Sequence, residues 1–167
     1  VLKQEKNANF ALLRGFSSYP TIPTFDNLYG IKSASVTTYP MYKGIGRLVG
    51  MEPLPLNTNS LQGQITAIKA NINNYDFFYL HIKKTDSYGE DGNFKEKVKE
   101  IEKFDKLLPQ LIELNFNVIA ITGDHSTPSR MKSHSWHPVP VLIRSDNSYN
   151  GLSKRFTESE CLEKQIV

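Results

Sequence analysis

The feature that most constrains the fold is a strongly amphipathic segment set between two short apolar runs. The runs Phe77–Ile82 and Val118–Thr122 are largely apolar, as in strands that are buried on both faces of a parallel sheet. Between them, apolar residues recur at three- and four-residue spacing over 94–112, which predicts a helix with one face against a sheet. Asn93, with Glu96 three residues later, predicts the N-terminal cap of this helix. Strand, helix and strand in this order predict a right-handed βαβ unit in a parallel sheet.

Similar patterns extend over most of the chain. Three more apolar runs predict buried strands: Phe10–Leu13, Ala34–Thr38 and Val139–Ile143. Three further segments predict helices: Met41–Val49, Leu61–Asn71 and Thr157–Gln165. Because no internal repeat or domain boundary is visible, we expect one α/β domain with a mostly parallel sheet flanked by helices.

The composition narrows the class of protein. The net charge of +3 is spread along the chain without a run of five like charges, which argues against a nucleic-acid surface. No apolar run approaches the roughly 18 residues of a membrane span. The single cysteine, Cys161, excludes an intrachain disulfide and a cysteine-based zinc site, and it agrees with a reducing cytoplasm. We therefore expect a cytoplasmic protein that binds neither nucleic acid nor membrane.

Polar residues that can bind metal follow two of the predicted strands. Asp86 lies in a polar cluster after the first strand of the βαβ unit, and Asp124 and His125 follow the second. Ligands of open parallel sheets bind beyond the carboxyl ends of the strands, so we expect these residues on one rim. A third cluster, rich in Gly, Ser and Pro, adds His134 and His137. Histidines in such loops are more often functional than histidines in a core.

The ligand types point to a divalent metal. Mixed Asp and His ligands suit Mn²⁺, Zn²⁺ or Fe²⁺, whereas Mg²⁺ prefers more oxygen. Two such ions a few ångströms apart form a clamp for phosphoryl transfer. The alternative is a set of solvated loops with helix-capping carboxylates, which we favour for Asp91 but not for Asp124 and His125. His81, inside an apolar run, is expected to be a core histidine or a partner of the ligands.

Several motifs together resemble a known family. They are Ala8–Gly15, Tyr39–Met51, His81–Asp86, Thr122–Ser129 and His134–Pro140. In combination they resemble the C-terminal core of the alkaline phosphatase superfamily and, more narrowly, the cofactor-independent phosphoglycerate mutases of the archaeal type. The resemblance covers nearly the whole chain. It implies that residues 1–167 are the C-terminal part of a phosphatase-like, metal-binding catalytic domain.

The resemblance also implies a reaction and a ligand set. The family interconverts 3-phosphoglycerate and 2-phosphoglycerate, a step of glycolysis and gluconeogenesis, through a phosphoserine on two divalent metal ions. Asp86 and His134 match ligands of one metal, and Asp124 and His125 match ligands of the other. Glu90 stands where many relatives carry His. We favour Glu90 as a fifth ligand over a mere neighbour, and a carboxylate there would favour Mn²⁺ or Mg²⁺ over Zn²⁺.

Basic residues match the family's substrate contacts. Arg14 and Lys43 correspond to residues that hold the substrate phosphate and neutralise charge during transfer, so the resemblance implies both binding and catalysis for them. Arg47 lies one helical turn beyond Lys43 and is expected to share its face, although a solvated role is equally open.

Other parts of the family pattern have no counterpart in these residues. The serine nucleophile and one further Asp ligand precede this region in the family, and the family's smaller inserted domain is also missing here. We therefore expect a fragment that is inactive alone and binds at most one metal well. Two alternatives stay open: another phosphatase or phosphotransferase of the same superfamily, and a non-catalytic metal-binding relative.

Overall fold

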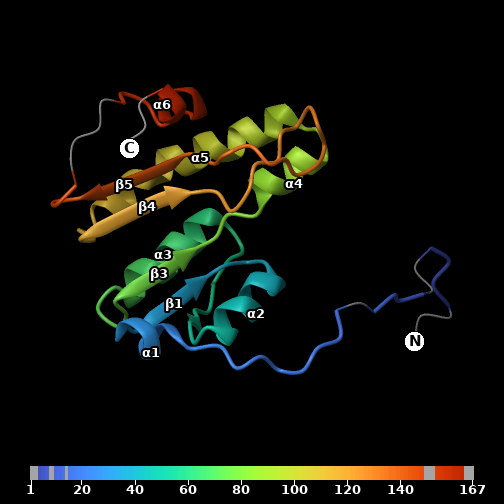
Figure 1. Cartoon of the computed structure of the whole chain (residues 1–167), viewed down its shortest axis with the longest axis horizontal. Coiled ribbons are helices and arrows are strands. Elements are labelled where there is room, and N and C mark those ends of the chain that lie inside the picture. The colour runs from blue at the N-terminus through green and yellow to red at the C-terminus, as the bar shows by residue number, and fades with distance from the viewer. Residues whose placement is uncertain (1–3, 8–9, 14, 149–152, 164–167) are drawn as a thin grey trace.

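The computed structural model describes residues 4–7, 10–13, 15–148 and 153–163 (Figure 1). Figure 1 shows a lower half built on β1 and β3 and an upper half built on β4 and β5. The elements in chain order are α1 (Phe25–Tyr29), β1 (Ser33–Val36), α2 (Pro40–Leu48), β2 (Glu52–Pro53), α3 (Leu61–Asn71), β3 (Phe77–Leu80), α4 (Lys84–Glu90), α5 (Phe94–Ile112), β4 (Val118–Thr122), β5 (Val141–Ser145) and α6 (Glu158–Glu163).

The lower half is a parallel three-stranded sheet in the order β2-β1-β3. All four residues of the central strand β1 are buried, because helices cover both of its faces. On one face, Ser35 contacts Gly46 of α2 so closely that a Cβ on Gly46 would lie 3.0 Å from the Ser35 Oγ. On the other face, Ala34 and Val36 join a hydrophobic cluster with α3.

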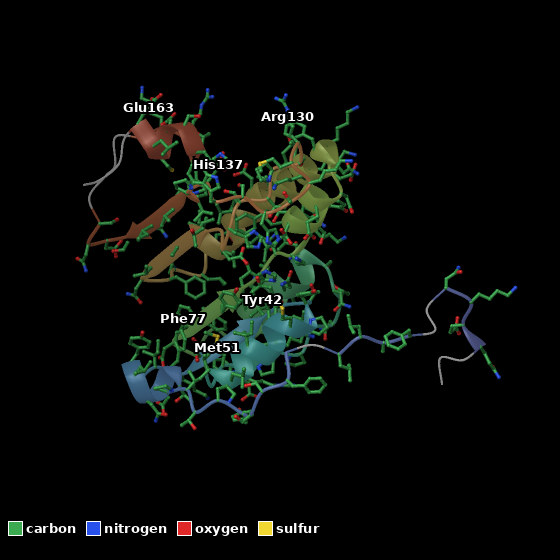
Figure 2. All side chains as sticks on the ribbon, turned by 45° about the vertical axis from the view of Figure 1, so that its right-hand side comes forward. Tyr42, Met51, Phe77, Arg130, His137 and Glu163 are labelled. Atoms are coloured by element: carbon green, nitrogen blue, oxygen red, sulfur yellow. The ribbon has the colours of Figure 1, made fainter. Side chains whose placement is uncertain are left out.

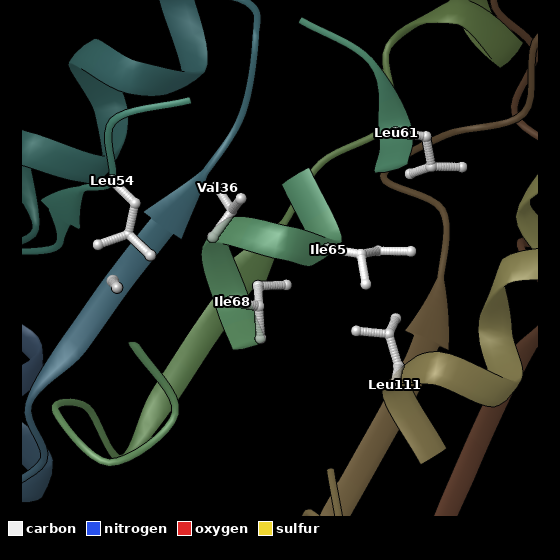
Figure 3. Close-up of a cluster of buried hydrophobic side chains, with 7 residues drawn as sticks. Val36, Leu54, Leu61, Ile65, Ile68 and Leu111 are labelled. Atoms are coloured by element: carbon white, nitrogen blue, oxygen red, sulfur yellow. The ribbon is translucent and has the colours of Figure 1, made fainter. Parts of the chain in front are cut away.

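The hydrophobic core lies between the sheet, α3 and the end of α5. Ile65 and Ile68 of α3 are almost completely buried, and Leu111 of α5 packs beside them (Figure 3). The cluster of buried residues is completed by Ala34, Val36, Leu54 and Leu61. Burying such side chains is the main stabilising contribution to a domain of this size.

One buried polar side chain fixes α3 against the sheet. The Gln64 Nε2 donates hydrogen bonds to the carbonyl oxygens of Val36 and His81, at 2.9 and 3.0 Å. These carbonyls lie at the carboxyl ends of β1 and β3, so Gln64 holds together the rim from which the polar loops leave.

The upper half is an antiparallel pair of strands, β4 and β5. Pairing sets Ala120 opposite Ile143 and Thr122 opposite Val141, so these side chains share one face of the ribbon. That face is exposed: Val118 and Ile143 keep 58% and 59% of their accessible surface. The opposite face, with Ile119, Ile121 and Leu142, is half-buried.

The predicted fold class is confirmed, and several elements have the predicted ends. The helix Leu61–Asn71, the helix over 94–112 and the strand Val118–Thr122 agree with the prediction residue by residue. The Asn93 side chain accepts a hydrogen bond from the Glu96 backbone N–H at 3.2 Å, as the predicted cap requires. The other predicted elements are present with shifted ends, except for the first strand. The predicted end of the helix Thr157–Gln165 lies outside the described residues.

The predicted strand Phe10–Leu13 is wrong. These residues have no strand conformation, and Phe10 is 81% exposed in a segment that extends away from the folded part in Figure 1. An apolar run becomes a strand only when a neighbouring strand satisfies its backbone groups, and none of the described residues pairs with it.

The predicted βαβ unit is also wrong in its pairing. Among the described residues β3 pairs with β1, whereas β4 pairs only with β5, so the strands on either side of α5 belong to different sheets. Local periodicity identifies strands and their order, but pairing is a long-range property.

Two short helices were not predicted. The polar cluster after β3 forms α4 instead of a loop, and α1 precedes β1. Thr24 caps α1 by accepting a hydrogen bond from the Asn27 backbone N–H at 3.2 Å. None of the helices in the described part of the chain is both long and apolar enough to cross a membrane.

Candidate metal centre

The loops at the carboxyl ends of β3 and β4 meet, although the two strands lie in different sheets. Asp86 stands in the first turn of α4, Asp124 and His125 directly follow β4, and His134 comes from the segment between β4 and β5. Asp86, His125 and His134 each offer a ligand atom within 4.8 Å of the other two. The predicted meeting of the clusters is therefore observed, for a different topological reason than the one expected.

One group of donors surrounds the His134 imidazole. Its Nε2 lies 3.5 Å from the Asp86 Oδ1 and 3.5 Å from the Glu90 Oε1. Asp86 and Glu90 are four residues apart in α4, which sets them on the same face of the helix. Two carboxylates and one imidazole thus lie close together: Asp86 and His134, which the resemblance implies for one metal, and Glu90, which stands where many relatives carry His.

A second group is formed by Asp124 and His125. The His125 Nε2 lies 3.6 Å from the Asp124 Oδ2. The ring centroids of His125 and His134 are 3.8 Å apart, so the two groups adjoin. The His125 Nδ1 lies 3.9 Å from the Asp86 Oδ1, but it is also 3.0 Å from the Thr127 hydroxyl. We therefore assign the free Nε2 of His125 to the group with Asp124.

The Asp86 carboxylate is held in its ionised form. Burial by itself would raise the pKa of Asp86, but hydrogen bonds from the Lys83 ammonium and the Thr127 hydroxyl outweigh it and lower the pKa. In turn, the bond to Asp86 raises the pKa of Lys83. An ionised carboxylate is the form that binds a cation.

The Asp124 carboxylate is oriented from the opposite side, by α2. The Tyr42 hydroxyl donates a hydrogen bond to the Asp124 Oδ2 at 2.5 Å. Burial again acts to raise the pKa of Asp124, but the Tyr42 hydrogen bond, backbone hydrogen bonds and the nearby His125 together outweigh it and lower the pKa. The same hydrogen bond raises the pKa of Tyr42. Figure 2 shows Tyr42 where the lower half of the molecule faces the upper half.

His81 supports this arrangement from the core. Its ring stacks on Tyr42 with centroids 3.7 Å apart, and its Nδ1 lies 3.4 Å from the Thr37 hydroxyl. Burial lowers the pKa of His81, which favours the neutral ring. Of the two predicted alternatives, this half-buried position beside Tyr42 is closer to a partner of the ligands than to a core histidine.

The structure separates the three predicted basic residues. Lys43 follows Tyr42 in α2 and is half-buried, so its backbone lies beside the candidate centre. Arg47 is exposed in the last turn of α2. Arg14 lies outside the described residues.

His137 lies apart from the donor atoms. Its Nδ1 is 2.8 Å from the Ser135 Oγ, and its ring stacks on Trp136. Figure 2 shows His137 in the upper half, away from Tyr42. Of the histidines in the predicted loops, only His125 and His134 contribute to the groups described above.

Sequence patterns missed three residues that contact the carboxylates: Tyr42, Lys83 and Thr127. Two of them adjoin predicted residues, since Tyr42 precedes Lys43 and Thr127 is two residues beyond His125. Their hydroxyl groups, close in sequence to predicted site residues, were a signal that could have identified them. The neighbouring sequence did not indicate which carboxylate each hydroxyl would contact.

Comparison with known proteins agrees with this geometry. The family described as Metalloenzyme superfamily matches residues 3–165. A curated relative from Aquifex aeolicus (strain VF5) is 53% identical over 166 residues, which is 99% of this chain and 41% of the relative. A relative from Thermosipho africanus is 55% identical over 161 residues, 96% of this chain and 40% of the relative. Both relatives are named "Probable 2,3-bisphosphoglycerate-independent phosphoglycerate mutase".

Solved structures give the same result. The PH0037 protein of Pyrococcus horikoshii superposes with a TM-score of 0.87 at 33% identity, over 95% of this chain and 44% of that chain. The cofactor-independent phosphoglycerate mutase from Thermoplasma acidophilum gives a TM-score of 0.70 at 26% identity, over 89% of this chain and 36% of that chain. The resemblance predicted from the motifs is confirmed. The chain spans 40 to 41% of the length of these curated relatives.

Proposed function

We propose that this chain, which belongs to the metalloenzyme superfamily, carries most of the metal centre of a 2,3-bisphosphoglycerate-independent phosphoglycerate mutase. Such an enzyme interconverts 3-phosphoglycerate and 2-phosphoglycerate. The observation that carries the proposal is the convergence of Asp86, Glu90 and His134 on one side and Asp124 and His125 on the other. Relatives named as mutases supply the reaction.

The donor set fits two adjacent divalent ions. Asp86, Glu90 and His134 would hold one ion, and Asp124 and His125 would hold part of the other. Three carboxylates with two imidazoles suit Mn²⁺ well and also accept Mg²⁺ or Zn²⁺. When bound, such ions activate an oxygen nucleophile and stabilise charge on the transferring phosphoryl group.

The chain's own residues prepare this site for cations. Lys83 and Thr127 orient Asp86, and Tyr42 orients Asp124. Both carboxylates are therefore already in position before a cation binds. Preorganised groups of this kind contribute to transition-state stabilisation because the reorganisation is completed during folding.

Basic residues near the centre are proposed to hold the substrate phosphate. Lys43 is the stronger candidate, since the adjacent Tyr42 contacts Asp124 and the Lys43 side chain is half-buried. Arg47 is a weaker one because it lies one turn farther on and is exposed. Arg14 is proposed from the resemblance alone. An ammonium or guanidinium group forms strong charge-assisted hydrogen bonds with phosphate.

The remainder of the enzyme is proposed to lie outside this chain. The curated relatives are more than twice as long, and the resemblance puts the serine nucleophile and one Asp ligand in their additional part. The exposed apolar face of β4 and β5, including Val118, Val141 and Ile143, is the surface that we propose this part covers. The chain alone is then expected to bind at most one metal well.

The same proposal includes the location and partners of the complete enzyme. We propose that it acts in the cytoplasm on a small phosphorylated substrate and binds neither membranes nor nucleic acids.

The test uses the complete protein that carries this sequence. We expect it to convert 3-phosphoglycerate into 2-phosphoglycerate in an enolase-coupled assay with Mn²⁺. Asp124→Asn should lower kcat/KM by at least about 100-fold, because metal clamps contribute several kcal/mol to the transition state. Asp146→Asn, an exposed carboxylate after β5, is the matched control and should retain activity.

Two outcomes would contradict the proposal. Release of inorganic phosphate without 2-phosphoglycerate would identify a phosphatase of the same superfamily instead. Turnover by the 167-residue chain alone would show that the nucleophile is not elsewhere.

A further inference from the structure

Thr127 stands between the two proposed metal sites and contacts a ligand of each. Its Oγ1 lies 2.5 Å from the Asp86 Oδ1 and 3.0 Å from the His125 Nδ1. The residue is only 4% exposed, so water does not compete freely for its hydroxyl. No other described hydroxyl bonds to ligands of both groups.

The Thr127 backbone is held firmly by two helices. The Lys97 ammonium of α5 donates a hydrogen bond to the Thr127 carbonyl oxygen at 2.6 Å. From α4, Gly89 approaches so closely that a Cβ there would lie 2.3 Å from the same oxygen and 2.9 Å from the Thr127 Cγ2. The Thr127 hydroxyl therefore has a fixed position from which it can orient the side chains of Asp86 and His125.

The single proton of the Thr127 hydroxyl determines which ring nitrogen of His125 carries a proton. A hydroxyl has one proton, and an ionised carboxylate can only accept, so the Thr127 proton is donated to Asp86. The bond to His125 then requires the imidazole Nδ1 to carry the proton and donate it to the Thr127 oxygen. This leaves the lone pair of the ring on Nε2, which lies on the side of Asp124 at 3.6 Å from its Oδ2.

We propose that Thr127 is a positioning residue that orients Asp86 and selects the Nδ1–H tautomer of His125, coupling the two metal sites. Ligating histidines commonly donate their second ring N–H to a partner that fixes tautomer and orientation. Here the Thr127 hydroxyl is the partner of His125 at one proposed metal site, and it also orients the Asp86 carboxylate of the other site. The metal-binding consequence rests on the proposed function, whereas the tautomer itself does not.

The first test needs no metal. Nitrogen-15 NMR of the imidazoles at a pH of about 8, where free histidine is neutral, reports which ring nitrogen carries the proton. We expect the Nδ1–H form for His125 in the unsubstituted chain and in Thr127→Ser. We expect the Nε2–H form to become the main one in Thr127→Val, which keeps the shape and removes the hydroxyl. Nδ1–H as the main form in Thr127→Val would overturn the proposal.

The second test follows Mn²⁺ binding by electron paramagnetic resonance in the complete protein. Loss of a partner of this kind weakens metal affinity by about 10- to 100-fold, and we expect Thr127→Val to weaken both sites. Thr127→Ser should restore affinity to within about threefold. Thr66→Val is the matched control, since the Thr66 hydroxyl donates a hydrogen bond within α3, to the Gln62 carbonyl, away from the candidate metal ligands.

The outcomes separate this inference from the proposed function. Unchanged Mn²⁺ affinity in Thr127→Val, with a normal unfolding transition, would refute the coupling while leaving the metal centre intact. Absence of Mn²⁺ binding by the unsubstituted protein would refute the metal centre, and with it the coupling, while the tautomer result would still decide the role of the hydroxyl.

Discussion

The strands of the two halves of the molecule are buried to different degrees, in the opposite sense to their hydrophobicity. β1, with the sequence Ser-Ala-Ser-Val, is buried on both faces, since α2 covers one face and α3 covers the other. β4, which is more apolar, has one half-buried face and one exposed face. The exposed face continues onto β5 through Val141 and Ile143. Burial in this fold therefore follows from which helices are present, and not from the hydrophobicity of the strand.

The candidate metal centre lies where these two halves meet. Asp86 follows β3 of the lower half, whereas Asp124 and His125 follow β4 of the upper half. The contacts between halves at this point are polar: Thr127 reaches Asp86, and Tyr42 reaches Asp124. A lower half with a fully buried central strand and a less covered upper half thus share one site. Substitutions in the core of the lower half and on the exposed face of the upper half can therefore test the packing of each half without changing the site residues.

The largest expected effect compares the same substitution in the two halves. Ile65→Ala removes a side chain that is 1% exposed in the lower half and should cost about 3 kcal/mol, within the usual range of about 2–5 for buried positions. Ile143→Ala acts on the exposed face and should cost less than about 1 kcal/mol. Urea unfolding with unchanged m values is the measurement.

Equal costs would break the comparison. If Ile143→Ala destabilised the chain as much as Ile65→Ala does, the outer face of β4 and β5 would be covered in solution. Measuring both variants at several protein concentrations would then identify the cover. If a second copy of the chain covers this face, the destabilisation by Ile143→Ala should become smaller as the protein is diluted.

A smaller effect is expected from the polar contact that anchors α3. Gln64→Leu leaves the buried carbonyls of Val36 and His81 without this donor, and each loss of this kind costs about 1–3 kcal/mol. Gln62→Leu is the control, because the exposed Gln62 side chain bonds to Gln110 at the surface and its loss should change stability by about 0.5 kcal/mol or less. Differential scanning calorimetry compares the two. Similar melting temperatures for both variants would show that water replaces Gln64 and that the lower half is less closed than described.

Much of the fold was predictable because the signals are local. The stripe of α5 and its cap at Asn93 depend on residues within a few positions of each other, and the structure confirms both. The pairing of β3 and β4 was not predictable from such signals, since edges and partners are set by contacts far apart in the chain. For the same reason Phe10–Leu13 was mistaken for a strand. Apolar character alone does not supply a pairing partner.

In the candidate site, too, residues with a local sequence signal were predictable, whereas contacts between distant residues were not. Asp86, Asp124, His125 and His134 could be predicted as candidate ligands because each follows a strand or lies in a loop of unusual composition. The side chains that orient them were missed, because Tyr42 and Asp124 are 82 residues apart and Thr127 and Asp86 are 41 apart. No pattern in a single sequence connects a hydroxyl with a carboxylate at that separation.

The smallest expected effect concerns pH and the boundary between the halves. Burial lowers the pKa of His81 in the folded chain, so between that value and about 6.5 the unfolded chain binds more protons. The free energy of unfolding should therefore be largest above about pH 6.5 and fall as the pH drops through the folded-state pKa. His81→Gln should flatten this slope, whereas His137→Gln, at an exposed loop position, should leave it in place. Urea titrations between about pH 5 and 7.5 measure it. A slope that persists in His81→Gln would assign the pH dependence to groups other than His81.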